Sequence, residues 1–176
     1  GKELVANALH QQSGLEGQLV PVNCGALSPE LVASELFGHE RGSFTGANRQ
    51  HVGAFERAEG GTLFLDEITE MSVEHQPLLL RALENQEITR VGGENTIGAT
   101  ARIVSASNRD AFAAIEAGCL REDLYYRLSV YPVEVPPLRD RMDDLPLLVD
   151  AFIAALNERY DGRRYLGNDA LSAFKK

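Results

Sequence analysis

Two adjacent carboxylates, Asp66 and Glu67, directly follow a short apolar run, Thr62 to Leu65. A continuous apolar run of this length is typical of a parallel strand that is covered on both faces. Such a strand would deliver both carboxylates to its carboxyl end, where Asp66 could orient Mg²⁺ through water. Glu67 could polarise a water molecule that attacks a phosphate. The pattern therefore indicates metal-assisted phosphate chemistry, and an acidic turn after a strand is the structural alternative.

The first three residues, Gly1-Lys2-Glu3, match the end of a phosphate-binding loop, G-x-x-x-x-G-K. In such a loop the backbone N–H groups and a helix N-terminus hold phosphates, and the lysine reaches the β and γ oxygens. The tripeptide alone is a weak signal, but together with Asp66 and Glu67 it predicts an ATP site with Walker A and Walker B elements. The sequence begins inside this loop, so we expect the 176-residue polypeptide to bind ATP weakly or not at all.

The composition is that of a globular chain with an acidic balance. Its 176 residues are 44% hydrophobic and 24% charged, enough for one packed core and the start of a second subdomain. The formal net charge of −9 argues against direct DNA binding by this domain, which needs clustered Lys and Arg. Cys24 and Cys119 form no CxxC pair, and the four histidines lack zinc-binding spacing. With no signal peptide and no long apolar run in the sequence, we expect a cytoplasmic protein without membrane association.

Strands and helices are expected to alternate along the chain. Buried strands are expected at 19–22, 62–65 and 102–106, a hairpin at 87–99, and helices at 2–12, 30–36, 54–58, 72–85 and 143–157. Ser72 is expected to cap its helix and Pro77 to bend it. The alternation predicts an α/β fold, a parallel sheet with helices on both faces. We expect an α/β core at 1–138 and the start of a helical lid subdomain at 139–176.

The segment Glu35 to Ala47, ELFGHERGSFTGA, places Phe44 and Thr45 between glycines in a polar loop. An apolar side chain on such a tip is disfavoured unless the loop contacts something. The segment resembles the GAFTGA loop of the sigma-54-dependent transcription activators, also called bacterial enhancer-binding proteins, a branch of the AAA+ P-loop ATPases. Five motifs occur in the order found in that family, over almost the whole chain. The sequence is thus similar to the family's central ATPase domain, truncated at both ends.

The resemblance implies catalytic roles for five residues. Asn23 corresponds to the asparagine that restrains Glu67 and relays the nucleotide state, and Asn108 corresponds to the sensor I residue near the γ-phosphate. Arg121 and Arg127, in LREDLYYRL, correspond to arginines that enter the neighbouring subunit's ATP site, which implies a ring, usually a hexamer. An arginine supplied in trans can raise the rate ~10³–10⁵-fold. The structural alternatives are turn capping by the asparagines and pairing of the arginines with acidic neighbours on one helix.

The resemblance also implies two sets of binding residues. The residues expected to bind ATP and Mg²⁺ are Gly1, Lys2, Glu3, Gly60, Gly61 and Asp66. The residues expected to contact the sigma-54 factor of RNA polymerase are Gly42, Ser43, Phe44, Thr45, Gly46 and Ala47. In this loop we expect Phe44 to make the apolar contact and Thr45 the hydrogen bond. Ser43 departs from the alanine of GAFTGA.

The function implied by the resemblance is ATP-driven remodelling of the closed promoter complex of the sigma-54 polymerase, which activates transcription. Three alternatives stay open. One is a regulator of the same fold without sigma-54 contact, for which Ser43 is the only hint. Another is an AAA+ motor with a different protein target, such as a chelatase, and the third is a chain that only folds and oligomerises. For the loop itself, the alternative is a glycine-rich surface loop whose Phe44 packs back on the domain.

Overall fold

A computed structural model describes residues 1–26, 28–160 and 162–167 of the chain. The chain divides into two compact units, Gly1–Pro132 and Val133–Lys176. The α/β core was expected to span residues 1–138, and the first compact unit ends at Pro132.

The first unit is built on a three-stranded parallel sheet in the order β1-β2-β5. The strands are β1 (Leu19–Asn23), β2 (Thr62–Asp66) and β5 (Arg102–Ser105). The central strand β2 is buried along Thr62–Leu65, as its continuous apolar run predicts. In the register, Asn23 pairs with Asp66 and Leu65 pairs with Ser105. The carboxyl ends of all three strands therefore meet at one edge, the place where open α/β sheets bind ligands.

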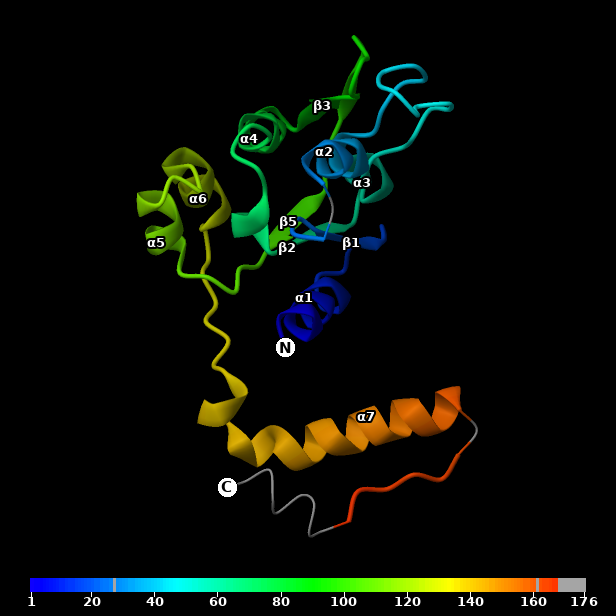
Figure 1. Cartoon of the computed structure of the whole chain (residues 1–176), viewed down its shortest axis with the longest axis vertical. Helices are drawn as coiled ribbons and strands as arrows, with labels where there is room; N and C mark the ends of the chain where they lie inside the picture. Colours follow the sequence, from blue (N-terminus) through cyan, green and yellow to red (C-terminus); the bar gives the residue numbers. More distant parts are fainter. Residues whose placement is uncertain (27, 161, 168–176) are drawn as a thin grey trace. The chain divides into compact units, whose positions relative to one another are not determined.

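Helices cover both faces of this sheet, with α1 on one side and α2, α3 and α4 on the other (Figure 1). The helices of the first unit are α1 (Lys2–Gln11), α2 (Pro29–Phe37), α3 (Ala54–Arg57), the 3-10 turn η1 (Ile68–Glu70), α4 (Gln76–Asn85), α5 (Ala111–Glu116) and α6 (Glu122–Leu128). This arrangement confirms the predicted α/β fold. The core lies between the sheet and the helices, where Leu63 and Leu65 of β2 are fully buried with Leu36, Leu79 and Leu124. Burial of each such leucine stabilises the fold by about 1.5–3 kcal/mol.

The helix α4 begins later than expected, and this changes the part that Pro77 plays. The helix starts at Gln76, so Pro77 lies in its first turn, where a backbone N–H has no intrahelical partner to lose. The expectation that Pro77 bends the helix was therefore wrong. Ser72 was also wrongly placed as the helix cap, since its hydroxyl pairs with Nδ1 of His75 over 3.1 Å.

The predicted hairpin is present as β3 (Glu87–Thr89) and β4 (Thr96–Gly98), which pair antiparallel. It leaves the end of α4 and projects from the first unit beside the loop between α2 and α3 (Figure 1). Ile88 is its buried member, at 4% exposure, and it attaches the hairpin to the main core.

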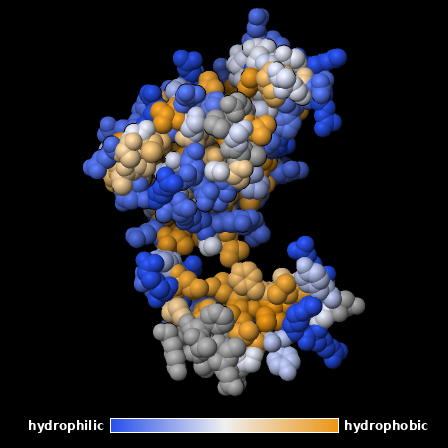
Figure 2. Space-filling view, in the orientation of Figure 1, coloured by the Kyte–Doolittle hydropathy of each residue, from blue (hydrophilic) through white to orange (hydrophobic). Residues whose placement is uncertain are grey.

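The second unit consists of two 3-10 turns, η2 (Leu138–Asp140) and η3 (Met142–Asp144), and the helix α7 (Leu145–Arg159). The helix predicted at 143–157 is thus confirmed with slightly shifted ends. Within the expected lid, residues 161 and 168–176 lie outside the described residues. Leu147 and Phe152 of α7 are largely exposed, and Figure 2 shows apolar residues gathered on this unit. Among the described residues, every helix is too short or too polar to cross a lipid bilayer.

Candidate functional site

The two carboxylates of the sequence motif lie at the carboxyl edge of the sheet. Asp66 ends β2, and its Oδ1 accepts a hydrogen bond from the backbone N–H of Glu67 over 3.0 Å. Glu67 adopts a left-handed conformation, with φ 54° and ψ 46°, which is uncommon for a residue with a side chain. Strain of this kind gathers at functional positions, because the surrounding structure must hold it. Here the left-handed turn directly follows β2, at the carboxyl edge of the sheet.

The Glu67 carboxylate lies between Asn108 and the start of the loop after β1. Asn108 Nδ2 donates to Glu67 Oε1 over 3.3 Å, so the sequence-predicted sensor residue reaches the predicted water-polarising residue. On the other side, a Cβ added to Gly25 would lie 2.8 Å from Glu67 Oε2. The absence of a side chain at Gly25 thus makes room for the carboxylate.

Asn23 lies at the same edge but makes a different contact. Its Oδ1 accepts a hydrogen bond from the backbone N–H of Gly25 over 2.8 Å, which is the turn-capping geometry. In the described part of the chain, the side-chain amide that contacts Glu67 is that of Asn108. Asn23 therefore reaches Glu67 only indirectly in this structure, through the Gly25 turn that borders the carboxylate.

The pKa of Cys24 reflects the negative charge at this edge of the sheet. Its side chain is 2% exposed, and its backbone N–H donates to the carbonyl of Asp66 over 2.9 Å. Burial, together with the negative charges of Asp66 and Glu67, raises the pKa of the Cys24 thiol to about 12. The thiol is therefore neutral at physiological pH, and the local field favours a cation.

Lys2 is the first residue of α1, which packs on β2. At the far end of α1, His10 Nδ1 pairs with Thr62 Oγ1 at the start of β2 over 2.9 Å, and the helix runs back from this contact to the chain N-terminus (Figure 1). Both elements are about 15 Å long by their standard rises. The N-terminus of α1, with Gly1 as its capping residue and Glu3 in the first turn, therefore lies toward the Asp66 end. Its first N–H groups have no intrahelical partner, which suits an anionic group.

Gly60 and Gly61 lie at the opposite end of β2, before its first residue. A Cβ on Gly61 would lie 2.2 Å from the carbonyl oxygen of Gln18, so two backbone segments cross closely there. Gly60 turns the chain with φ +66°. The expectation that these glycines bind the cofactor is corrected, because the whole strand separates them from Asp66. They serve the packing of β1 against β2.

The two arginines of the LREDLYYRL segment lie at the two ends of α6. Arg121 caps the start of the helix and binds Asp123 through two hydrogen bonds of 3.0 and 2.7 Å. This pairing lowers the pKa of Asp123 and raises that of Arg121. At the other end, Arg127 Nη2 donates to the carbonyl of Leu83 near the end of α4 over 2.9 Å. Within one chain, both arginines thus have partners on the surface around α6.

The loop predicted to contact sigma-54 is a compact turn between α2 and α3. Gly42 and Ala47 join its two ends through a hydrogen bond of 2.8 Å from the Gly42 N–H to the Ala47 carbonyl, and Gly46 has a φ of 103°. Ala47 is buried, whereas Thr45 is exposed and Phe44 is 40% exposed. The Phe44 ring lies edge-on to His39, with the ring centres 4.9 Å apart. The tip is therefore partly packed back on the loop base, as the structural alternative described.

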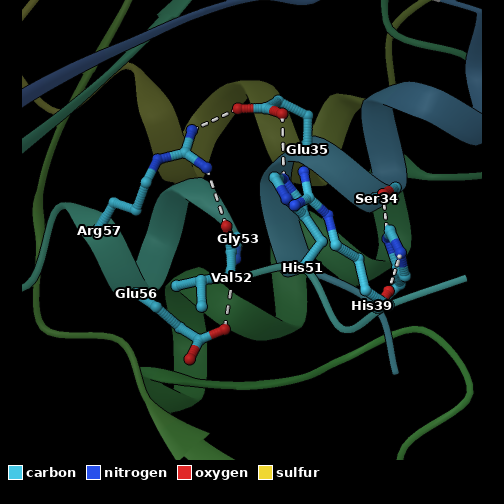
Figure 3. Close-up of polar contacts among 9 residues, drawn as sticks. Ser34, Glu35, His39, His51, Val52, Gly53, Glu56 and Arg57 are labelled. Carbon is cyan, nitrogen blue, oxygen red and sulfur yellow. Dashed lines mark hydrogen bonds and ion pairs between the residues drawn. The ribbon is translucent and has the colours of Figure 1, made fainter. Parts of the chain in front are cut away.

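The base of this loop is held by a polar network around His39 and His51, which Figure 3 shows. The two histidines exchange backbone hydrogen bonds of 3.1 and 2.9 Å. His39 Nδ1 pairs with the Ser34 hydroxyl over 2.7 Å. Glu35 of α2 binds His51 Nε2 over 3.3 Å and also Arg57 of α3. The loop therefore rises from a base that ties α2 to α3.

Arg90, which follows β3, is the residue that sequence reasoning missed. Its guanidinium binds Glu40 over 2.9 Å and Glu56 through bonds of 2.9 and 2.6 Å. These hydrogen bonds lower the pKa of both carboxyl groups and raise the pKa of Arg90. Gly92 packs against Ser43, because an added Cβ would lie 2.5 Å from the Ser43 Cβ. The hairpin thus supports both the base and the flank of the loop, a long-range contact with no local sequence signal.

No cluster of three or more metal-ligating side chains occurs among the described residues. Mg²⁺ is usually bound by one or two carboxylates together with water and substrate phosphates. Asp66 and Glu67 supply hard oxygen ligands at the carboxyl edge of the sheet. The neutral Cys24 thiol does not compete with them for the metal ion. The carboxylate oxygens of Asp66 and Glu67 therefore suit a Mg²⁺ ion that is bound together with ATP.

Comparison with known proteins identifies the family of this chain. The family model described as the Sigma-54 interaction domain matches residues 1–134. The chain is 52% identical over 153 residues to the DNA-binding transcriptional activator HyfR of Escherichia coli, covering 86% of the chain and 23% of HyfR. It is 50% identical over 177 residues to the DNA-binding transcriptional regulator NtrC of Rhizobium meliloti, covering 99% of the chain and 36% of NtrC. The chain thus spans about a quarter to a third of the length of these relatives.

Solved structures show the same fold. NtrX from Brucella abortus superposes with a TM-score of 0.88 at 41% identity, covering 99% of this chain and 39% of that of NtrX. NtrX has also been solved in complex with ADP and in complex with ATP, each at a TM-score of 0.86. The family model, the relatives and the solved structures together show that this chain belongs to the Sigma-54 interaction domain family, the AAA+ ATPase-type domain of sigma-54-dependent transcriptional activators.

Proposed function

We propose that this domain hydrolyses ATP and uses the energy to remodel the closed complex of the sigma-54 RNA polymerase. The observation that carries the proposal is the insertion of the Phe44 loop between β1 and β2, the strands that end in Asn23 and Asp66. A loop in this position is joined through the chain to the carboxyl edge of the sheet, where we place the nucleotide. The ATP and ADP complexes of NtrX support binding of the same nucleotides here.

In the hydrolysis step, Lys2 and the N-terminus of α1 would hold the phosphates of ATP. When bound, Mg²⁺ supplies charge neutralisation on the phosphate oxygens, and Asp66 would hold it, through water. Glu67 would orient and polarise the attacking water, and its carboxylate is already positioned by Asn108 at 3.3 Å. Asn108 would sense loss of the γ-phosphate, and Asn23 would respond through the Gly25 turn beside Glu67.

The arginines of α6 would complete the site in trans. Arg121 and Arg127 are exposed on the surface of the first unit, where Arg121 binds Asp123 and Arg127 binds the carbonyl of Leu83. A ring, in this family usually a hexamer, would bring them to the ATP of the neighbouring subunit. There their charge would stabilise the transferring phosphoryl group, an effect worth ~10³–10⁵ in rate.

The output is movement of the Phe44 loop. A change at Glu67 would pass through β1 and α2 to the loop base, where Arg90 joins Glu40 to Glu56. Release of Phe44 from His39 would expose the ring to sigma-54, and Thr45 would add a hydrogen bond. Relatives of this chain are named as transcriptional activators, which supports this partner. Work on RNA polymerase would take place in the cytoplasm.

The test is Phe44→Ala, and separately Thr45→Ala, in the full-length protein, with Val73→Ala as a control at another exposed apolar side chain. We expect either loop variant to abolish sigma-54 binding in a transition-state nucleotide complex and open-complex formation, while ATP hydrolysis persists. Undiminished open-complex formation in either loop variant would refute the role of the loop. Retained hydrolysis by the unaltered protein with no sigma-54 binding would favour a regulator of the same fold without that contact.

A further inference from the structure

Gln76 is a fully buried polar side chain that the catalytic scheme above does not use. It is the first residue of α4, and its side chain has 0% exposure. Its Nε2 donates to the carbonyl of Met71 over 3.0 Å and to the carbonyl of Cys119 over 2.8 Å. Its Oε1 accepts a hydrogen bond from the backbone N–H of Arg121 over 2.8 Å. Breaking such a network destabilises the fold, because each buried polar group left without a hydrogen-bond partner costs free energy.

Two of these three bonds hold the backbone on both sides of Leu120, immediately before the Arg121 side chain. Leu120 is 4% exposed and Leu124, in the next turn of α6, is fully buried. The backbone that carries Arg121 is therefore held both by apolar packing and by the Gln76 amide. A shift of Arg121 along the surface would break two hydrogen bonds to the buried Gln76 side chain.

The third bond links this backbone to the nucleotide edge. Met71 closes the 3-10 turn η1, which directly follows Glu67. Gln76 therefore connects the chain leaving Asp66 and Glu67 to the chain arriving at Arg121. The helices α4 and α6 lie side by side in Figure 1, and Arg127 binds Leu83 near the other end of α4. The helix α4 thus holds α6 at both ends.

We propose that Gln76 is a positioning residue for Arg121, which sets where that arginine stands when it enters the ATP site of the next subunit. The inference rests on the proposed trans role of Arg121. Gln76 acts on the backbone and touches neither substrate nor Mg²⁺. Its loss would misplace Arg121 while leaving nucleotide binding to Lys2 and α1 intact.

The first test compares Gln76→Met with Thr62→Val in the full-length protein. Met fills a similar volume without the three hydrogen bonds. Thr62 is equally buried and pairs with His10 away from α6, so it controls for loss of a buried polar contact. A displacement of about 1 Å can cost about 10²-fold in rate, so we expect Gln76→Met to lower kcat by about 10- to 100-fold. The Kd for ADP should not change, and Thr62→Val should keep its kcat.

A mixed-ring experiment separates positioning from general damage. One subunit carries Glu67→Gln and can only donate its arginine, and the other carries Arg121→Ala and can only accept one. We expect Gln76→Met to lower the activity of the mixed rings when it is placed in the donor subunit and to have little effect in the acceptor. Equal loss in both placements, or loss in the acceptor alone, would overturn the proposal.

A conservative variant guards against misfolding. In Gln76→Glu, burial should keep the new carboxyl group protonated. The variant then keeps the acceptor for the Arg121 N–H and one donor, so it should retain more donor activity than Gln76→Met. The reverse order would count against the proposal. If mixed rings without any Gln76 change regain no activity, the trans role of Arg121 fails and this inference fails with it. If they regain activity but are indifferent to Gln76, only the inference on Gln76 fails.

Discussion

Arg90 donates two parallel hydrogen bonds to Glu56, from Nε to Oε1 over 2.9 Å and from Nη2 to Oε2 over 2.6 Å. The Arg90 side chain is 17% exposed and the Glu56 side chain 14%, so the pair is largely removed from water. A third bond, to Glu40, brings the base of the Phe44 loop into the same cluster. The hairpin, α3 and the loop therefore move as one assembly unless this cluster opens.

The Arg90 cluster should make stability depend on pH. The pKa of Glu40 and of Glu56 is lowered below the ordinary 4.5, chiefly by the hydrogen bonds from Arg90. A carboxyl group with a lowered pKa stabilises the fold above its ordinary value, and that stability is lost as the pH falls below 4.5. We expect the Tm of the unaltered protein to fall in this acidic range. The Tm of Arg90→Met should be lower at neutral pH and should fall less steeply as the pH decreases. Calorimetry with Arg139→Met, an exposed arginine, as control would check this, and parallel curves for all three proteins would contradict it.

Glu67 and Asn108 should separate hydrolysis from binding. We expect Glu67→Gln to lower kcat by about 10²–10⁴-fold, the range for loss of a positioned acid–base group. Asn108→Ala should have a smaller effect, because Glu67 keeps its strained backbone and loses one contact. The affinity for ADP should persist in both, since Lys2 and α1 are unaltered. Glu59→Gln, at the other end of β2, is the matched control, and a wild-type rate in Glu67→Gln would refute the assignment.

Gly61 should matter for folding and not for the nucleotide. In Gly61→Ala, the new methyl group meets the Gln18 backbone, which cannot move away cheaply, so the free energy of unfolding should fall by about 1–3 kcal/mol. Gly60→Ala has space but a φ of +66°, so it should cost about 1 kcal/mol. Denaturant unfolding measures both changes. Weakened ADP binding by folded Gly61→Ala would restore the original assignment to the cofactor site.

Cys24 should resist alkylation in the folded protein. With a pKa of about 12, only about 10⁻⁴ of its thiol is ionised at pH 8, and the side chain is buried. Cys119 is partly exposed and serves as the internal comparison. Mass spectrometry after timed labelling should find Cys119 modified first and Cys24 only on unfolding. Equal labelling of the two would show that the carboxylate edge is more open than the structure indicates.

Much of the fold could be predicted because its signals are local. The apolar run Thr62 to Leu65 and the alternation of strands with helices indicated a parallel sheet, and the sheet brings Asn23 and Asp66 into register. The start of α4 could not be predicted from the sequence, because Ser72 and Gln76 both lie just before the helical pattern of apolar residues. Tertiary contacts determine which of the two begins the helix. Buried hydrogen bonds of Gln76 to Met71, Cys119 and Arg121 favour a helix that begins at Gln76.

By itself, the sequence determined the chemistry that is available: the Asp66-Glu67 pair after an apolar strand, Lys2 at a helix start, and Phe44-Thr45 between glycines. Residue types and short spacings carry that information, because each motif lies within one element or one turn. Only the tertiary structure decided which residues meet. In the folded chain Asn108 contacts Glu67, and Arg90 binds both Glu40 and Glu56. Gly60 and Gly61 lie at the opposite end of β2 from Asp66. These contacts join segments far apart in the chain, so they depend on how the strands align and the helices pack, which no local pattern encodes.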